Sequence, residues 1–153
     1  MPSPDRGADA EEAIRALIGA YAERLDAGDL DGVAALFERG VFRSARGGPA
    51  RTGAAEVRRI YDAVILYDDG TPRTKHVLGN VLVDIDDTEC TATASCTFTV
   101  LQAIPGHALR AVLSGRYVDR FDRDSGAHGA WHFAERVVHP DLLGDLSHHM
   151  AAR

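Results

Sequence analysis

The sequence is poor in cysteine and contains no CxxC pair. Its two cysteines are Cys90 and Cys96, and the common zinc-binding spacing of cysteines is therefore missing. If both lie on one strand, at ~3.3 Å per residue about 20 Å separates them, which is too far for a disulfide. A chain without a disulfide framework is typical of a reducing compartment, and we expect a cytoplasmic protein.

Long apolar runs are also missing. No stretch approaches the roughly 20 apolar residues that span a membrane, and residues 1–9 carry no signal-peptide pattern. The formal net charge of −6 argues against nucleic acid or an anionic membrane as the main partner. Lysine is nearly absent, since Lys75 stands alone among the arginines, and this bias suggests a GC-rich bacterial genome.

The 153 residues, of which 45% are hydrophobic, have the length of one domain with a core and room for one pocket. We expect a polar tail over residues 1–9, a domain over 10–140 and a C-terminal tail over 141–153. Apolar residues from Glu11 onward lie on one helix face and are Ile14, Leu17, Ile18, Tyr21 and Leu25. Gly28 ends this helix, and Asp29 can cap a short second one.

A third helix is expected from Thr52 to the break at Asp68, on the stripe Val57, Ile60, Tyr61, Val64 and Ile65. Val41–Ser44 reads as a short strand. The period then changes to two, which predicts four longer strands over residues 74–86, 91–103, 109–122 and 130–139. Short turns between them indicate an antiparallel meander, and Gly79 and Gly115 mark bends or bulges.

Three helices followed by consecutive strands predict an α+β domain, in which a curved, antiparallel-rich sheet wraps around the helices and encloses a cone-shaped cavity. A small molecule would bind in that cavity. Its expected apolar walls are Leu17, Val57, Tyr61, Leu78 and Leu82.

Tyr21 and Asp26 are the first candidates for chemistry. Tyr21 lies on the apolar stripe, so its hydroxyl points inward, and Asp26 lies in the last helical turn, where the helix dipole disfavours negative charge. The alternative is a core tyrosine beside a solvated acid. His76 is the next candidate, because alternation places it with Leu78, Asn80 and Leu82 on one strand face. An imidazole titrates near neutrality, although a lone histidine is more often structural.

The last strand supplies Trp131 and Arg136. Alternation places Trp131, Phe133 and Glu135 on one face and Arg136 on the other. Arg136 could orient a ligand carboxylate or phenolate, or it could pair with Asp119 on the facing strand. His128 and His132 have HxxxH spacing but run from a turn into a strand, so no metal site is expected. The remaining histidines, together with His128, are expected to be solvent-exposed; they are His107, His139, His148 and His149.

Four stretches carry a resemblance to a known family: Ile14–Asp29 with Leu36-Phe37, Thr74-Lys-His76, Gly115–Phe121, and Trp131. Together they resemble SnoaL-like proteins of the nuclear transport factor 2-like (cystatin-like) superfamily, nearest the scytalone dehydratase and bile-acid 7α-dehydratase subgroup. The resemblance implies a cone-shaped fold over roughly residues 10 to 140 and a homodimer or homotrimer formed through the sheet.

The same resemblance implies a cofactor-free acid–base enzyme, of the dehydratase or isomerase type, acting on a small hydrophobic cyclic or aromatic molecule. His76 would transfer the proton, Asp26 would orient it, and Tyr21 would polarise a substrate oxygen. Substrate-binding candidates are Arg136, Asn80, Tyr61 and Trp131. Val100 or Leu101, and Phe42, stand where those dehydratases carry polar residues. The alternative is a non-catalytic small-molecule binder or a dioxygenase β-type assembly subunit.

Overall fold

The computed structural model describes residues 4–86, 88, 90–126 and 129–152. In chain order the elements are α1 (Pro4–Asp26), α2 (Leu30–Ala35), β1 (Val41–Ser44), β2 (Arg51–Thr52), α3 (Gly53–Ile60), the 3-10 helix η1 (Tyr61–Ala63), β3 (Thr74–Ile85), β4 (Thr91–Gln102), β5 (Arg110–Arg123) and β6 (Trp131–Leu143). No helix in these ranges has the length and apolar character needed to cross a bilayer.

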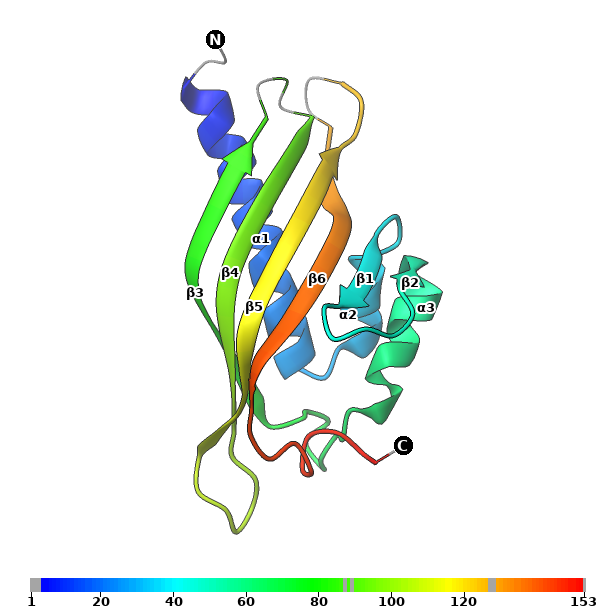
Figure 1. Ribbon diagram of the computed structural model, residues 1–153, viewed down its shortest axis with the longest axis vertical. Helices are drawn as coiled ribbons and strands as arrows, with labels where there is room; N and C mark the ends of the chain where they lie inside the picture. Colours follow the sequence, from blue (N-terminus) through cyan, green and yellow to red (C-terminus); the bar gives the residue numbers. More distant parts are fainter. Residues whose placement is uncertain (1–3, 87, 89, 127–128, 153) are drawn as a thin grey trace.

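The sheet has the strand order β2-β1-β6-β5-β4-β3. Strands β3 to β6 form the expected antiparallel meander, whereas β1 pairs in parallel with β6. Figure 1 shows α1 lying behind these long strands, with α2, α3 and the two short strands gathered beyond β6. The predicted α+β class with a curved, antiparallel-rich sheet is confirmed.

Helices α1 and α2 are separated where the sequence predicts, whereas the start of α1 and the end of α3 differ from the prediction. The expected stripe of α1 is buried apart from the half-buried Leu17, and Ala10 and Ala22 are buried beside it. The helix begins at Pro4 and not at Glu11. Once a helix is nucleated, each added residue gains one backbone hydrogen bond, so the helix extends into residues that have no apolar stripe. Gly28 ends α1 with φ 76°, and the Asp29 side chain accepts a hydrogen bond of 2.9 Å from the Gly32 N–H, capping α2.

The third helix is shorter than expected. Helix α3 ends at Ile60, and after η1 the chain turns extended at Val64. Val64 pairs with Met150, and the Ala151 N–H donates to the Ala63 carbonyl over 2.7 Å. The prediction of a helix up to Asp68 was therefore wrong, because pairing with the C-terminal segment replaces the helical hydrogen bonds. That segment follows β6, which runs to Leu143.

Two bulges change which strand residues face the helices. In β3 the register shifts between Gly79 and Leu82, where Asn80 has φ 50°. Beyond the bulge the inward positions become Val81, Val83 and Ile85, so the prediction that Asn80 and Leu82 share a face with His76 was wrong. Asn80 is exposed, and Leu82, proposed as a cavity wall, is 69% exposed.

The second bulge lies in β6. Phe121 pairs with Phe133 while Arg120 pairs with Glu135, so Ala134 is left without a partner. An extra residue in one strand moves the following side chains to the other face. Phe133 and Arg136 are both fully buried as a result, and the prediction that they lie on opposite faces was wrong. The bends expected at Gly79 and Gly115 coincide with register shifts.

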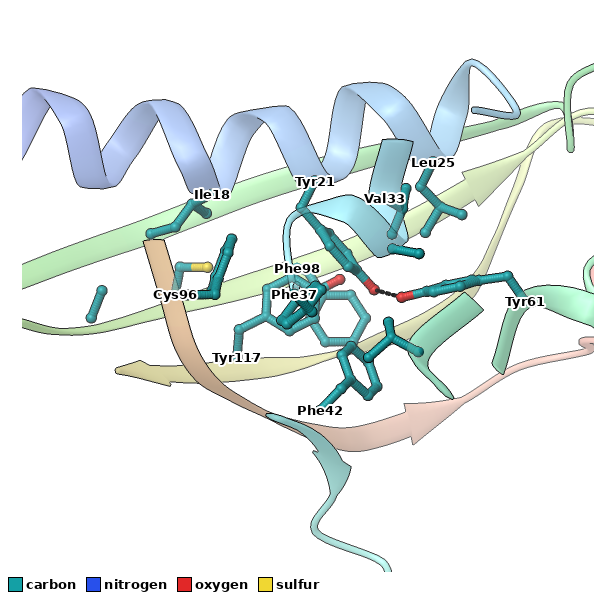
Figure 2. Packing of buried hydrophobic residues seen from close by; sticks show 14 of the residues in the cluster. Ile18, Tyr21, Leu25, Val33, Phe37, Phe42, Tyr61, Cys96, Phe98 and Tyr117 are labelled. Atoms are coloured by element: carbon teal, nitrogen blue, oxygen red, sulfur yellow. Dashed lines mark hydrogen bonds between the residues drawn. The ribbon is translucent and has the colours of Figure 1, made fainter. Parts of the chain in front are cut away.

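The concave side of the sheet is filled by aromatic side chains (Figure 2). Phe98 and Tyr117 stack with ring centroids 4.3 Å apart, and Phe37 stacks on Phe133 at 4.8 Å. Tyr21 lies at the centre of this group, with Tyr117 edge-on at 5.6 Å. Aromatic packing of this kind adds to the area term of burial, so the interior around Tyr21 is densely packed.

Candidate acid–base site

Asp26 and His76 meet at the end of α1, beside the start of β3. The His76 Nδ1 atom lies 2.6 Å from Asp26 Oδ1, and the backbone N–H of His76 donates to Oδ2 over 2.7 Å. The Thr74 hydroxyl donates to Oδ1 over 2.9 Å. The carboxylate is thus fixed from three sides, and two of its contacts come from the histidine that it orients.

These contacts keep Asp26 ionised. Burial raises the pKa of Asp26, but the hydrogen bonds and charge of His76, helped by Thr74, outweigh burial and bring the pKa below its ordinary value. An ionised carboxylate accepts the Nδ1–H of His76, which leaves the lone pair on Nε2. No described residue hydrogen-bonds that Nε2 atom, so it is available as a proton acceptor.

The pair lies on the wall of a cleft of about 480 Å³ between α1 and β3. The lining residues are Ala22, Glu23, Asp26, Ala27, Thr74, Lys75 and His76. The His76 side chain is only 4% exposed and that of Asp26 is 13% exposed. The dyad is therefore shielded from bulk water yet borders a space in which a small molecule could contact it.

Tyr21 and Tyr61 form a separate polar pair inside the aromatic core. Their hydroxyls are 2.8 Å apart, as the dashed line in Figure 2 marks. Burial raises the pKa of both phenols, and that of Tyr61 lies well above its ordinary range. Both hydroxyls stay protonated at neutral pH. Neither tyrosine lines the Asp26–His76 cleft, so the structure does not bring the three expected catalytic residues to one surface.

Arg136 resolves the alternative that its sequence position left open. Its Nε and Nη2 atoms each lie 2.8 Å from the two carboxylate oxygens of Asp119, and both side chains are fully buried. The guanidinium also lies over the rings of Tyr117 at 3.8 Å and Tyr21 at 4.3 Å. Burial lowers the pKa of Arg136, but Asp119 more than compensates. Arg136 is a core residue.

Trp131 lies away from the dyad. It lines a different groove of about 740 Å³ between α1 and the start of β6, formed largely by the alanines of α1. Leu17, expected as a wall of the shared cavity, lies in this groove too. Leu17 and Asp26 are on different sides of α1. The residues expected to line one cavity therefore line two separate depressions, the groove at Trp131 and the cleft at His76.

Val100 and Phe42, which stand where the dehydratases of the resemblance carry polar residues, are both buried. Val100 is 1% exposed and pairs directly with His76 across β4 and β3. Phe42 is 8% exposed, and its ring centroid lies 6.4 Å from that of Tyr61. Any second polar group near His76 must therefore come from elsewhere in the chain.

One histidine thought to be exposed is buried. His149 is 6% exposed, whereas His107 is exposed as expected and His139 and His148 are half-buried. His132 contacts Arg39, and His128 lies outside the described residues. The burial of His149 was missed because no periodic pattern marks the C-terminal segment.

The comparisons with known proteins agree with this fold. A family model described as SnoaL-like domain matches residues 6–137. An NTF2-like protein with a cystatin-like fold from Novosphingobium aromaticivorans superposes with a TM-score of 0.70 at 23% identity, covering 89% of this chain and 84% of that one. Among curated protein sequences, none matches.

Two further solved structures are similar. A protein from Novosphingobium aromaticivorans, provisionally named scytalone dehydratase, gives a TM-score of 0.72 at 19% identity, covering 94% of this chain and 91% of that one. A protein from Catenulispora acidiphila, solved in complex with S-DNPA, gives a TM-score of 0.68 at 22% identity, covering 88% of this chain and 95% of that one. At these identities the likeness concerns the fold.

Proposed function

Since the chain belongs to the SnoaL-like domain family, we propose that it is a cofactor-free acid–base enzyme, of the dehydratase or isomerase type, for a small hydrophobic cyclic or aromatic molecule. The observation that carries this proposal is the 2.6 Å contact between His76 Nδ1 and Asp26 Oδ1 on the wall of a cleft. A histidine oriented by a carboxylate, with its second nitrogen free, is suited to proton transfer.

The chemistry follows from the protonation states. His76 Nε2 takes a proton from the carbon next to a substrate carbonyl, and the electron pair moves onto the carbonyl oxygen. In a dehydration, the pair returns to form a carbon–carbon double bond, and the β-hydroxyl leaves as water with the proton that His76 carried. In an isomerisation, the proton returns to a different carbon. Neither route needs a metal or a nucleotide, because the side chains supply and accept every proton.

Tyr21 and Tyr61 are not included in this step, because their paired hydroxyls lie in the aromatic core and neither tyrosine lines the Asp26–His76 cleft. Arg136 and Asn80 are not included, since Arg136 is occupied by Asp119 and Asn80 is exposed.

A non-catalytic small-molecule-binding protein is the second candidate. It is favoured by Val100, an apolar residue directly opposite His76.

A homodimer or homotrimer through the outer face of the sheet is also proposed. Leu82 and Val118, 69% and 40% exposed, both pair with Ser95 on that face, and exposed apolar residues in one place are typical of interfaces.

The experiment follows deuterium incorporation next to the carbonyl of 2-tetralone, a bicyclic aromatic ketone, in D₂O. We expect the protein to accelerate exchange and His76→Gln to slow it by about 10²-fold or more, the range of general acid–base catalysis. The matched control is His107→Gln, because His107 is exposed and lies outside the cleft. Equal exchange by wild type and His76→Gln would contradict the proposal and favour the binding protein.

A further inference from the structure

Two buried side chains near the dyad each carry a polar atom without a hydrogen-bond partner. These atoms are Gln102 Oε1 and His149 Nδ1, and the residues are 2% and 6% exposed. A buried polar atom left unpaired is strongly unfavourable, and such atoms in a native protein require an explanation. Because both belong to the same end of the molecule, one ligand group can explain both.

Gln102 lies beside the catalytic candidates on the inward face of the sheet. It pairs with Thr74, the residue that holds Asp26, while its neighbour Val100 pairs with His76. Gln102 and His76 are therefore diagonal neighbours, which are roughly 7–8 Å apart in an antiparallel pair. Gln102 does not line the cleft itself, so a ligand contacts it only by extending inward past His76.

The orientation of the Gln102 amide is fixed by its donors. Its Nε2 group donates to the carbonyl of Pro72 over 3.1 Å and to the carbonyl of His148 over 3.0 Å. Two carbonyl acceptors can only be served by the NH₂ end. Oε1 is therefore the end left without a partner, and it can only accept a hydrogen bond.

His149 is held against the same end of the sheet by its backbone. Its N–H donates to the Leu146 carbonyl and its carbonyl accepts from the Ile65 N–H, both over 2.9 Å. The preceding carbonyl, that of His148, is the one bound by Gln102. Burial, and then the charge of His76, lower the pKa of His149 to about 4, with Asp26 opposing. A neutral imidazole carries one N–H and one acceptor nitrogen, so His149 can donate without bearing charge.

We propose that Gln102 and His149 form a subsite for an alcohol hydroxyl beside His76. Gln102 Oε1 accepts the hydroxyl proton, and His149 Nδ1–H donates to the hydroxyl oxygen. A hydroxyl satisfies both atoms, whereas a ketone oxygen only accepts and leaves Oε1 unpaired. The ligand class is a hydrophobic cyclic alcohol. The subsite rests on the proposed function in one respect, which is that the ligand binds at His76.

The family match does not assign this subsite, because it ends at residue 137, before His149. Gln102 lies two positions after Val100 on the buried face of β4. The polar contact missing opposite His76 is thus supplied from the end of that strand and from the C-terminal segment.

The test compares the affinities of 2-tetralol and 2-tetralone, which differ in the oxygen group, by calorimetric titration. We expect wild type to bind the alcohol about tenfold more tightly, the worth of roughly one well-placed hydrogen bond. His149→Phe removes Nδ1 and should abolish this preference. His149→Asn places an amide N–H near the same position and should retain it, which a merely space-filling role of His149 would not explain.

Gln102→Leu should also abolish the preference, with folding checked by its unfolding midpoint, since Gln102 also tethers two carbonyls. Equal affinities for the two probes in wild type, no measurable binding of the alcohol at millimolar concentration, or an unchanged preference in His149→Phe would each overturn the subsite. His76→Gln should keep the preference while losing exchange, so failure of the subsite and failure of the proposed function are distinguishable.

Discussion

Removing one partner of the buried Arg136–Asp119 pair should destabilise the protein far more than removing both. Arg136→Met leaves the Asp119 carboxylate, 1% exposed, without the two 2.8 Å contacts that hold it. Breaking a buried pair in this way costs about 3–5 kcal/mol, whereas replacing both charges with apolar residues is often neutral or stabilising. Arg136→Met with Asp119→Leu should therefore recover at least about 2 kcal/mol of the loss.

The assay is urea unfolding followed by circular dichroism. With a slope of about 2 kcal/mol per molar urea, a loss of 3 kcal/mol lowers the midpoint by about 1.5 M. The matched control is Arg120→Met, because the Arg120 side chain is 60% exposed and lies 3.9 Å from Glu135; such exposed pairs contribute little. If Arg136→Met falls within 1 kcal/mol of wild type, or the double variant is less stable than the single one, the reasoning is refuted.

Three other substitutions are predicted to change the stability of the protein. Burial lowers the pKa of His149 to about 4 from 6.5. As the pH falls below 6.5, the unfolded state therefore binds a proton before the folded state does, and the free energy of unfolding decreases. The loss reaches about 3 kcal/mol near pH 4 and is absent above pH 6.5. In His149→Phe the urea midpoint should depend less on pH between 4 and 6.5, and a pH dependence equal to that of the wild type would contradict this prediction. Gly115→Ala should destabilise by about 1–3 kcal/mol, because its Cβ would lie 2.0 Å from the His139 carbonyl oxygen. Gly19→Ala, with open space around its Cβ, should instead stabilise by about 0.5–1 kcal/mol, and equal midpoints for the two variants would show that the close approach is tolerated.

The parts of the fold that depend on local pattern were predictable from the sequence. Amphipathic spacing identified the buried face of α1, and the change of period identified β3 to β6. Asp29 was recognised as a cap because its side chain serves the N–H groups of the next turn. The contact of Asp26 with His76 came from the family resemblance, which brought together residues that lie fifty positions apart in the chain.

The errors arose where long-range pairing overrides local pattern. The bulge at Asn80 reverses the alternation of β3, and alternation alone contains no sign of an added residue. Pairing of Val64 with Met150 ends the third helix. His149 lies next to Met150 on the same C-terminal segment, and its backbone carbonyl accepts a hydrogen bond from the Ile65 N–H. Gln102, in contrast, was visible as the last inward residue of an otherwise apolar strand face, and it was not singled out.

The central claim is that Asp26 holds His76 with a proton on Nδ1 and a free lone pair on Nε2. The direct measurement is the tautomer of His76 at neutral pH, read from the ¹⁵N chemical shifts of its ring nitrogens by NMR. We predict the Nδ1–H tautomer in the wild type, and a changed equilibrium in Asp26→Asn, whose amide no longer offers a charged acceptor. An Nε2–H tautomer in the wild type, or identical spectra for the two proteins, would contradict the claim.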